Sequence, residues 1–450
     1  MIQLCRPQTN AVFQRDENGV ASVPISGNID AADGALVRAR VSGEWTEVAT
    51  VQAGAFAGEL PGLRTGGPHE LEIAIGDQMA SVGDLMVGDL FILAGQSNMD
   101  GCGKLVDCEE PHESVRCFYY DDRWAVAEDP LCWYNEAVDP VHWGEGVTEE
   151  NRAEWIQFDR DFRVGGAGLG VRFGKEIHER IGVPVGLLAC SHGGTSQEQW
   201  SPRHADLAGR SLYGSMLRRV EAVGGKVKAC LWYQGESDAN SETAPLFEKN
   251  MRALIEAIRA DLSQPDLPFL QVQLGPFYND EGFDAWNDVQ LTQLALEDLI
   301  HGVATVAAID LELSDAIHIS TGSGIRLGER MAHVAQRFVY GDESKQFGPR
   351  LTDITVSADR RTIELRFTGV NGSLLPASGS PGFTIDAGGE QVAIPERAVR
   401  DASTVVLGLR EPLPANATLW HGRGLNPAVG LRDEADLTVP VFARDLTESG

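Results

Sequence analysis

The sequence has no long apolar run and has few basic residues relative to acidic ones. No stretch approaches the roughly 18 consecutive apolar residues of a membrane-spanning helix, so a membrane protein is not expected. Only 37 Lys and Arg residues stand against 66 Asp and Glu residues, which gives a net charge of −29 at pH 7. This excess of negative charge opposes binding to nucleic acid or to an anionic membrane. A neutral substrate is the expected partner, and the sequence indicates no oligomeric state.

Other absences concern location and cofactors. The first residues, MIQLCRPQTN, lack the basic and apolar regions of a signal peptide. This favours a cytoplasmic protein, or a secreted or periplasmic one if a leader was removed. The seven cysteines form no C-x-x-C pair, as expected of reduced thiols. Walker, dinucleotide-binding and H-E-x-x-H patterns are also absent, so we predict no cofactor and no metal site.

Three regions differ in their pattern of apolar residues. Residues 1–88 and 344–450 contain short β-rich runs between Gly and Pro turns, which predicts a sandwich-like β domain at each end. Residues 89–343 alternate apolar runs with amphipathic segments, which is typical of an α/β domain with a parallel sheet and helices on both faces. The expected strands are 91–95, 184–190, 227–235, 268–275 and 303–310. The expected helices are 170–181, 211–223, 244–262, 285–299 and 322–339.

The segment 100–165 separates the first expected strand from the first expected helix, and it is rich in aromatic residues. Connections of more than ~12–15 residues without regular structure are uncommon and tend to be functional. We expect this segment to wall a pocket, with at least one of Trp124, Trp133 and Trp143 facing that pocket.

Ser97 directly follows the apolar run FILAG and its glycine turn. Ligand sites of open α/β sheets lie at the carboxyl ends of the strands, and Ser97 is expected at such an end. The polar residues at 191–195, 234–238 and 310–318 follow other strands and are expected at the same edge. A serine in such a turn is most often structural, and Met99 stands where the G-x-S-x-G motif needs glycine.

A serine becomes a nucleophile when a base removes its proton and a third group orients that base. His318 follows the last expected strand, and Asp315 lies three residues before it. The D-x-x-H spacing alone is weak, but its position at a strand end strengthens it. An oxyanion would need donors, for which the Ser97 N–H, a glycine of GGAGLG (165–170) and the Gln234 amide are candidates. The glycine run can equally be the start of a helix, and Gln234 can belong to a plain capping turn.

Four motifs occur in order along the chain, namely GQSNM (95–99), SHGGTSQEQW (191–200), WYQGESDA (232–239) and DAIH (315–318). Together they resemble the SGNH-hydrolase superfamily, and within it the sialate O-acetylesterases and related carbohydrate acetylesterases. GDLFILAGQSNM and the closing LWHGRGLNPAVGLRDEADLTVPVF are similar to the same family, so the likeness covers nearly the whole chain. It implies an SGNH-type three-layer αβα domain between two β-sandwich-like domains.

The resemblance also implies roles for individual residues. Ser97 would be the nucleophile, His318 the general base and Asp315 the residue that orients it. The oxyanion hole would combine Ser97 with Gly168, or with Gly166 or Gly170 instead, and with Gln234, which stands where the superfamily has asparagine. Substrate contacts are expected from Gln96, Asn98, Gly194, Thr195, Glu236 and Trp124.

The activity implied by the resemblance is that of a metal-independent serine esterase. It would hydrolyse acetyl esters on a mono-, oligo- or polysaccharide. Two alternatives stay open, a catalytically inactive carbohydrate-binding or scaffolding protein and an esterase for another acyl group. No evident arginine clamp for a sialic acid carboxylate is present, which favours neutral glycans. The candidates for such a clamp are Arg116, Arg123, Arg163 and Arg203.

Overall fold

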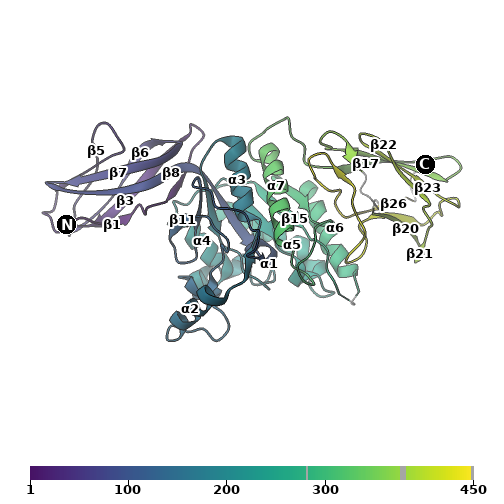
Figure 1. Ribbon diagram of the computed structural model, residues 1–450, viewed down its shortest axis with the longest axis horizontal. Coiled ribbons are helices and arrows are strands. Elements are labelled where there is room, and N and C mark those ends of the chain that lie inside the picture. Colours follow the sequence, from purple (N-terminus) through teal and green to yellow (C-terminus); the bar gives the residue numbers. More distant parts are fainter. Residues whose placement is uncertain (280–281, 376–381, 447–450) are drawn as a thin grey trace.

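The computed structural model describes residues 1–279, 282–375 and 382–446. It is an elongated molecule in which an α/β region lies between a β region at the N-terminal end and another at the C-terminal end (Figure 1). The predicted C-terminal domain, 344–450, therefore falls partly outside the described residues. The predicted α/β fold class is confirmed by this architecture.

The central sheet is built around strand β8 (Gln78–Gly95). Its strands follow the order β11-β10-β13-β8-β14-β15-β16, and all neighbours are parallel except β11 at the edge. The other strands are β10 (Val115–Phe118), β11 (Trp124–Val126), β13 (Val185–Ala189), β14 (Ala229–Tyr233), β15 (Phe269–Gln273) and β16 (Val303–Ala307). Every residue of the last four is buried, as expected of a parallel sheet covered on both faces.

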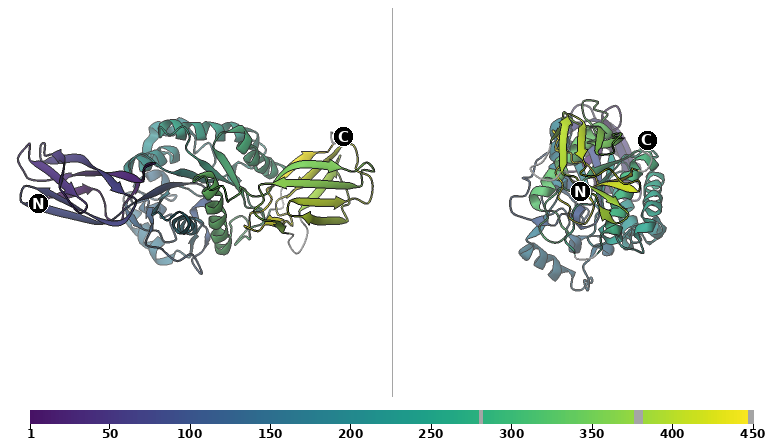
Figure 2. Two further views of the ribbon diagram at one scale, coloured as in Figure 1. Left: turned by 90° about the horizontal axis from the view of Figure 1, so that it is seen from above. Right: turned by 90° about the vertical axis from the view of Figure 1, so that its right-hand side faces the viewer.

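Helices lie on both sides of this sheet (Figure 2). They are α1 (Ser97–Asp100), α2 (Arg152–Phe162), α3 (Gly170–Ile181), α4 (Leu212–Ala222), α5 (Phe247–Asp261), α6 (Asp284–Leu299) and α7 (Thr321–Phe338). Helix α3 buries Phe173, Gly174 and Ile177, which share one face at helical spacing. A Cβ on Gly174 would lie 2.5 Å from a methyl group of Val115, so glycine lets α3 pack closely on β10. All five expected helices are present, with ends within three residues of the expected ones.

Strand β8 joins the N-terminal region to the central sheet. Its first half pairs with β7 (Gly66–Ile75), and from Asp89 onward it lies parallel to β13 and β14. The expected domain boundary after residue 88 falls inside this strand, and the two regions share one hydrophobic core. The remaining strands of this region are β1 (Gln3–Arg6), β2 (Val12–Gln14), β3 (Val20–Asn28), β4 (Leu36–Arg40), β5 (Thr46–Thr50) and β6 (Ala55–Arg64).

The segment 100–165 is more regular than its sequence indicated. It contributes β10 and β11 to the central sheet, helix α2, and strand β9 (Gly103–Lys104), which pairs with β12 (Gly165–Ala167). The expectation of a connection without regular structure is therefore wrong. Strands of three or four residues are too short for a periodic pattern to stand out.

The C-terminal region has a hydrophobic core of its own. It meets the central region partly through polar contacts, among them two hydrogen bonds between the Gln273 amide and the Val441 backbone, 2.8 and 3.0 Å long. Its strands are β17 (Arg350–Val356), β18 (Thr362–Thr368), β19 (Leu374–Leu375), β20 (Phe383–Ala387), β21 (Glu390–Gln391), β22 (Glu396–Asp401), β23 (Thr404–Gly408), β24 (Ala417–His421), β25 (Arg432–Asp433) and β26 (Phe442–Asp445). Within the described ranges, no helix is both long enough and apolar enough to cross a membrane.

Candidate active site

Ser97 is presented by a sharp turn at the carboxyl end of β8. Gly95 has a φ of +132°, and a Cβ there would lie 2.1 Å from the carbonyl oxygen of Tyr233 on the neighbouring strand. Only glycine fits both the backbone conformation and this close approach. Helix α1 begins at Ser97 and turns Met99 into the core, where it is buried. The serine therefore stays at the edge of the sheet, next to the ends of β13 and β14.

The side chains of Ser97, His318 and Asp315 form one hydrogen-bonded chain. His318 Nε2 lies 3.0 Å from Ser97 Oγ, and His318 Nδ1 lies 2.7 Å from Asp315 Oδ2. The other carboxylate oxygen of Asp315 accepts the backbone N–H groups of Ile317 and His318, at 2.9 and 2.8 Å. With Nδ1–H donating to the carboxylate, Nε2 is left to accept the serine proton.

The same contacts keep Asp315 ionised. Partial burial raises the pKa of this carboxyl group, but the backbone N–H groups of Ile317 and His318 and the His318 ring lower it further, to below its ordinary value. A charged carboxylate at this place stabilises the imidazolium that forms when His318 accepts a proton.

Asn98 links the loops around this chain rather than facing the substrate space. Its amide oxygen accepts the N–H of Ile319 at 3.0 Å, and its amide nitrogen donates to Glu236 at 2.8 Å and to the Ile317 carbonyl at 3.3 Å. Asn98 is buried. The expected substrate contact is therefore not found, because both polar atoms of the Asn98 side chain form hydrogen bonds that hold the His318 loop beside Ser97.

A cavity of about 500 Å³ opens in front of Ser97 and His318. Three of the residues expected to bind substrate line it, namely Gln96, Gly194 and Glu236. The rest of its wall is made by Asp100, Gly101, Cys102, Tyr134, Arg163, Gly193, Ser237 and Ile317.

Two of the expected oxyanion donors, Gly168 and Gln234, have other hydrogen-bond partners and do not line the cavity. The Gly168 N–H donates to Asp129 Oδ2 at 3.3 Å, and Gly168 packs behind the cavity against Gly101. The Gln234 amide nitrogen donates to the Thr195 carbonyl at 3.1 Å and to Asp238 at 2.6 Å. Neither residue lines the cavity, because both are held by partners beneath it.

Thr195 and Trp124 also lie away from the cavity. The Thr195 hydroxyl donates to the His192 carbonyl at 2.6 Å and accepts the Trp200 ring N–H at 3.0 Å. Trp124 is buried, packs against Phe118 and borders a different hollow of the segment 100–165. Neither residue lines the cavity of Ser97, so the structure gives no support to the substrate contacts predicted for them.

Trp133 and Trp143 likewise do not line the cavity of Ser97. Trp133 borders the same hollow as Trp124, and the guanidinium group of Arg160 lies 3.9 Å from its ring centre. The Trp143 ring N–H donates to the Ala137 carbonyl at 2.9 Å. At least one of the three tryptophans was expected to face the pocket, and none of them lines this one.

Sequence reasoning missed Tyr134 and Asp100, and it placed Gly193 at this edge within 191–195 without predicting a role for it. A Cβ on Gly193 would lie 3.5 Å from the Cβ of Ser97, so the glycine permits close approach to the nucleophile. Its N–H donates to the Tyr134 hydroxyl at 2.7 Å, and that hydroxyl donates to Asp100. Asp100 lies one helical turn after Ser97 and therefore on the same side of α1, a spacing that could have identified it. Tyr134 carried no local signal.

Burial dominates the electrostatics of the cavity. It raises the pKa of Asp100 to about 6 and also raises the pKa of Glu236 above its ordinary value. It raises the pKa of the Cys102 thiol to about 12, so this cysteine is a poor competing nucleophile. Of the four arginines considered as carboxylate ligands, Arg163 is the one that lines the cavity.

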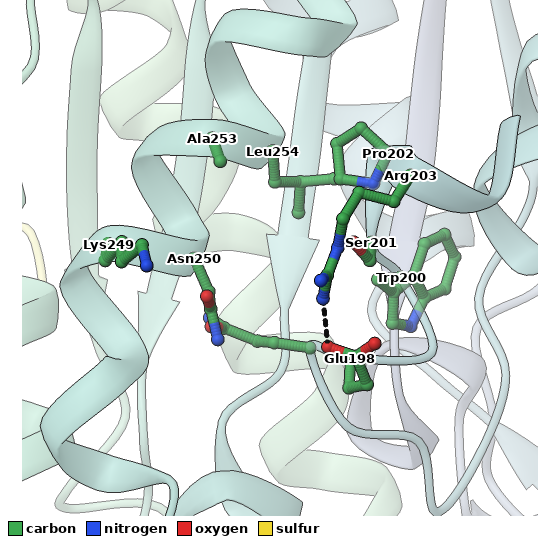
Figure 3. Close-up of a pocket in the computed structure, with 10 residues that line it drawn as sticks. Glu198, Trp200, Ser201, Pro202, Arg203, Lys249, Asn250, Ala253 and Leu254 are labelled. Atoms are coloured by element: carbon green, nitrogen blue, oxygen red, sulfur yellow. Dashed lines mark hydrogen bonds and ion pairs between the residues drawn. The ribbon is translucent and has the colours of Figure 1, made fainter.

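A second cavity, of about 310 Å³, lies between residues 197–203 and helix α5 (Figure 3). Arg203 and Glu198 form an ion pair of 2.6 Å at its wall. Ser201 lines this cavity too, but no histidine is among the described residues that line it. His204 lies nearby, with its backbone N–H donating to the Ser201 carbonyl and its ring nitrogen 3.9 Å from Glu198. Elsewhere in the described part of the chain, no three His, Cys, Asp or Glu side chains gather as metal ligands would.

Comparison with known families identifies the central region. A family model described as carbohydrate esterase, sialic acid-specific acetylesterase, matches residues 87–337. A probable carbohydrate esterase of Arabidopsis thaliana is 32% identical over 256 residues, which are 54% of this chain and 88% of the plant protein. Human sialate O-acetylesterase is 25% identical over 196 residues, 39% of this chain and 36% of the human protein. The match thus spans about a third of the human relative.

Among solved structures, a carbohydrate acetylesterase from Xanthomonas citri superposes with a TM-score of 0.71. The alignment covers 99% of this chain and 100% of the other, at 23% sequence identity. This likeness includes both terminal β regions, and it is a likeness of fold.

Proposed function

Because the chain belongs to the carbohydrate esterase family of sialic acid-specific acetylesterases, and is thus an esterase, we propose that Ser97, His318 and Asp315 hydrolyse acetyl esters on a carbohydrate. One observation carries the proposal, the 3.0 Å contact between Ser97 Oγ and a His318 ring whose other nitrogen is bound by Asp315. Three groups in this relation activate a serine hydroxyl as a nucleophile.

The reaction begins when Ser97 Oγ attacks the acetyl carbonyl carbon and its proton passes to His318 Nε2. The bond between that carbon and the sugar oxygen then breaks, and His318 gives its proton to this oxygen, which leaves as the sugar hydroxyl. Water then attacks the acetyl carbon on Ser97 while His318 accepts its proton. The bond between that carbon and Ser97 Oγ breaks, acetate leaves, and His318 returns the proton to Ser97. Asp315 stays ionised throughout and holds the ring in the tautomer that these steps need.

The oxyanion requires donors that are already in place. The Ser97 N–H, at the first position of α1, is one such donor. The second is the Gly193 N–H, since this glycine lies against the Ser97 side chain. In the free protein it donates to the Tyr134 hydroxyl, and it exchanges that bond for the oxyanion when substrate is bound.

A neutral acetylated sugar suits the cavity best. Asp100 and Glu236 place two carboxyl groups in its wall, and the whole chain carries a net charge of −29. Both repel an anionic substrate, although repulsion across solvent is screened beyond about 8 Å at physiological salt. Arg163 offers one positive charge to a sugar acid, so a single O-acetylated sialic acid is weaker but permitted as a substrate.

Acetate release from a substrate panel tests the proposal. The panel contains acetylated xylo-oligosaccharides, glucose pentaacetate and O-acetylated sialic acid, with p-nitrophenyl acetate and butyrate as small esters. We expect a burst of p-nitrophenol from the acetate, slower release from the butyrate, and acetate from the neutral sugars with or without EDTA. A tenfold preference for the sialic acid would overturn the neutral substrate, and faster turnover of butyrate would overturn acetyl as the acyl group. No release from any of them would favour an inactive carbohydrate-binding protein.

A further inference from the structure

Helix α2 turns its polar side toward the protein. None of its residues is buried, and its contacts with the body are made by charged and amide groups. Arg160 binds Glu136 through two hydrogen bonds of 2.6 and 2.8 Å, and Asp159 accepts the Asn135 amide at 2.8 Å. Arg152 donates to the Asn135 carbonyl at 2.6 Å. These bonds fix the helix largely through polar groups. Among its large apolar residues only Ile156 is half-buried, whereas the three aromatic ones are exposed, which is unlike a normal surface helix.

The apolar side of α2 faces solvent. Trp155, Phe158 and Phe162 are 42%, 53% and 65% exposed, and Val164 just beyond the helix is 79% exposed. Spacings of three and four residues place the three rings in one stripe, with centres 5.9 and 5.1 Å apart from ring to ring. The stripe runs ~10 Å along a helix that projects from the central region (Figure 1). Contiguous apolar surface of this kind marks a binding site.

The stripe and the catalytic cavity are connected through the chain. Arg163 directly follows Phe162, and its side chain lines the cavity of Ser97. It is held there by hydrogen bonds to the carbonyl oxygens of Cys132 and Gly165. The short helix η1 (Tyr134–Glu136), on which α2 is anchored, supplies Tyr134 to the same cavity. The segment that carries the stripe thus also supplies two residues of the cavity wall, Tyr134 and Arg163.

The size and charge of the stripe decide what covers it. Three half-exposed aromatic side chains offer roughly 300 Å², far below the ~800 Å² per partner of a stable protein interface. Helices that lie on membranes are rich in Lys and Arg, whereas residues 152–162 carry two arginines against three acidic residues. The rings are inclined to one another, by 74° for Trp155 and Phe158 and by 42° for Phe158 and Phe162, so each can offer its own contact to the C–H face of a sugar ring.

We propose that Trp155, Phe158 and Phe162 bind a glycan chain by stacking on its sugar rings while its acetylated unit occupies the cavity of Ser97. The inference rests on the proposed function, and it makes an oligo- or polysaccharide, not a single sugar, the preferred substrate. Stacking in this position lowers KM and adds nothing to the attack of Ser97 on a small ester.

The test compares substrates of different length. Acetylated xylose, acetylated xylo-oligosaccharides of two to six sugars and p-nitrophenyl acetate are assayed with the wild type, Trp155→Ala, Phe158→Ala and Trp155→Phe. We expect KM of the wild type to fall with chain length. Trp155→Ala and Phe158→Ala should each raise KM for the longest chains by about three- to tenfold, the range of one aromatic contact. Trp155→Phe keeps an aromatic ring and should therefore raise KM much less than Trp155→Ala does.

Leu299→Ala is the matched control. Leu299 is the last residue of α6 and is 45% exposed, and its replacement should change KM for neither the oligosaccharides nor p-nitrophenyl acetate. With p-nitrophenyl acetate, all variants should stay within about twofold of the wild type. A wild-type KM that does not depend on chain length, or equal losses on all substrates, would overturn the inference. Failure of the wild type on p-nitrophenyl acetate would instead contradict the proposed function.

Two further measurements separate other occupants of the stripe. Sedimentation of the wild type and of Trp155→Ala should show the same oligomeric state, and neither should bind phosphatidylcholine vesicles. Loss of a dimer in Trp155→Ala would assign the stripe to a second copy of the chain, and vesicle binding lost in that variant would assign it to a lipid surface. Either result would overturn the inference.

Discussion

The two cavities of the central region differ in what their walls can do. The cavity of Ser97, about 500 Å³, is lined from the carboxyl ends of several strands, and a serine, a histidine and a carboxylate meet there in sequence. The cavity beside α5, about 310 Å³, has a serine, an ion pair and a lysine, and the Ser201 hydroxyl accepts a 3.1 Å hydrogen bond from Arg203, a cation that removes no proton. A cavity can catalyse a reaction of this kind only where a nucleophile, a base and a group that orients the base contact one another in that sequence. In parallel sheets such side chains come together at the carboxyl ends of the strands.

The two cavities also supply matched side chains. Ser97 corresponds to Ser201, Asp315 to Glu198, and Arg163 to Arg203, each pair having one member at either site. Changing both members of a pair separates the chemistry of the site from the general cost of the substitution.

Replacement of the two serines should give the largest difference. Ser97→Ala removes the attacking oxygen, and in serine hydrolases loss of the nucleophile costs about 10⁶ in kcat. Ser201→Ala removes an exposed hydroxyl that accepts a 3.1 Å hydrogen bond from Arg203, and it should leave turnover within about twofold. Initial rates with p-nitrophenyl acetate measure both. Wild-type turnover in Ser97→Ala would show that another residue is the nucleophile.

The two carboxylates should give the next largest difference. Asp315→Asn can still accept the backbone N–H groups of its loop, but its NH₂ group would donate to His318 Nδ1 and hold the ring in the wrong tautomer. The loss of the orienting carboxylate costs about 10⁴ in kcat in related machinery. Glu198→Gln removes a surface ion pair with Arg203 and should leave kcat unchanged. Equal rates for Asp315→Asn and the wild type would remove Asp315 from the mechanism.

The catalytic cavity also shows which parts of a site can be predicted from the sequence. Ser97, Asp315 and His318 carry short local signals, namely a glycine turn at a strand end and a three-residue spacing. Their proximity followed from the rule that parallel strands end at one edge. Helices such as α3 were predictable because their buried residues repeat at helical spacing, which is set by the chain itself.

The missed features depend on distant partners. Gly168 does not line the cavity, and its N–H donates to Asp129, 39 residues earlier. The Tyr134 hydroxyl accepts the N–H of Gly193, which lies 59 residues later in the chain, and no sequence pattern predicts that contact. Strand β10 was missed because four residues are too few to show a period. Tertiary packing decides which way a backbone N–H group points. It also decides whether a short segment pairs as an edge strand of the sheet.

A smaller effect should appear in the pH dependence of stability. Burial raises the pKa of Asp100 from 3.8 to about 6, so the folded protein holds this proton more tightly than the unfolded chain does. The folded state is therefore not penalised below pH about 4, and it loses stability as the pH rises to about 6. The loss is ~3 kcal/mol at ~1.4 kcal/mol per pH unit.

Asp100→Asn should therefore raise the melting temperature at pH 7.5 and change it little at pH 4. Asparagine keeps an oxygen that can accept the Tyr134 hydroxyl. Glu198→Gln, in the other cavity, should show no such dependence on pH. Thermal unfolding of the three proteins across pH 4 to 8 measures the difference. A wild type and an Asp100→Asn variant that melt in parallel at all pH values would contradict a raised pKa for Asp100.

The smallest difference should come from the two arginines, and it bears on the substrate. Arg163 lines the catalytic cavity, whereas Arg203 lies at the wall of the other. If the substrate is a neutral acetylated sugar, Arg163→Gln should change KM by less than about threefold, since no substrate charge is left unpaired. For O-acetylated sialic acid, loss of a charge-assisted bond worth ~1.5–3 kcal/mol should raise KM by tenfold or more. Arg203→Gln should change KM for neither substrate. Steady-state kinetics on both sugars decide the matter, and a tenfold rise in KM for the neutral sugar with Arg163→Gln would mean that Arg163 binds the sugar hydroxyls themselves.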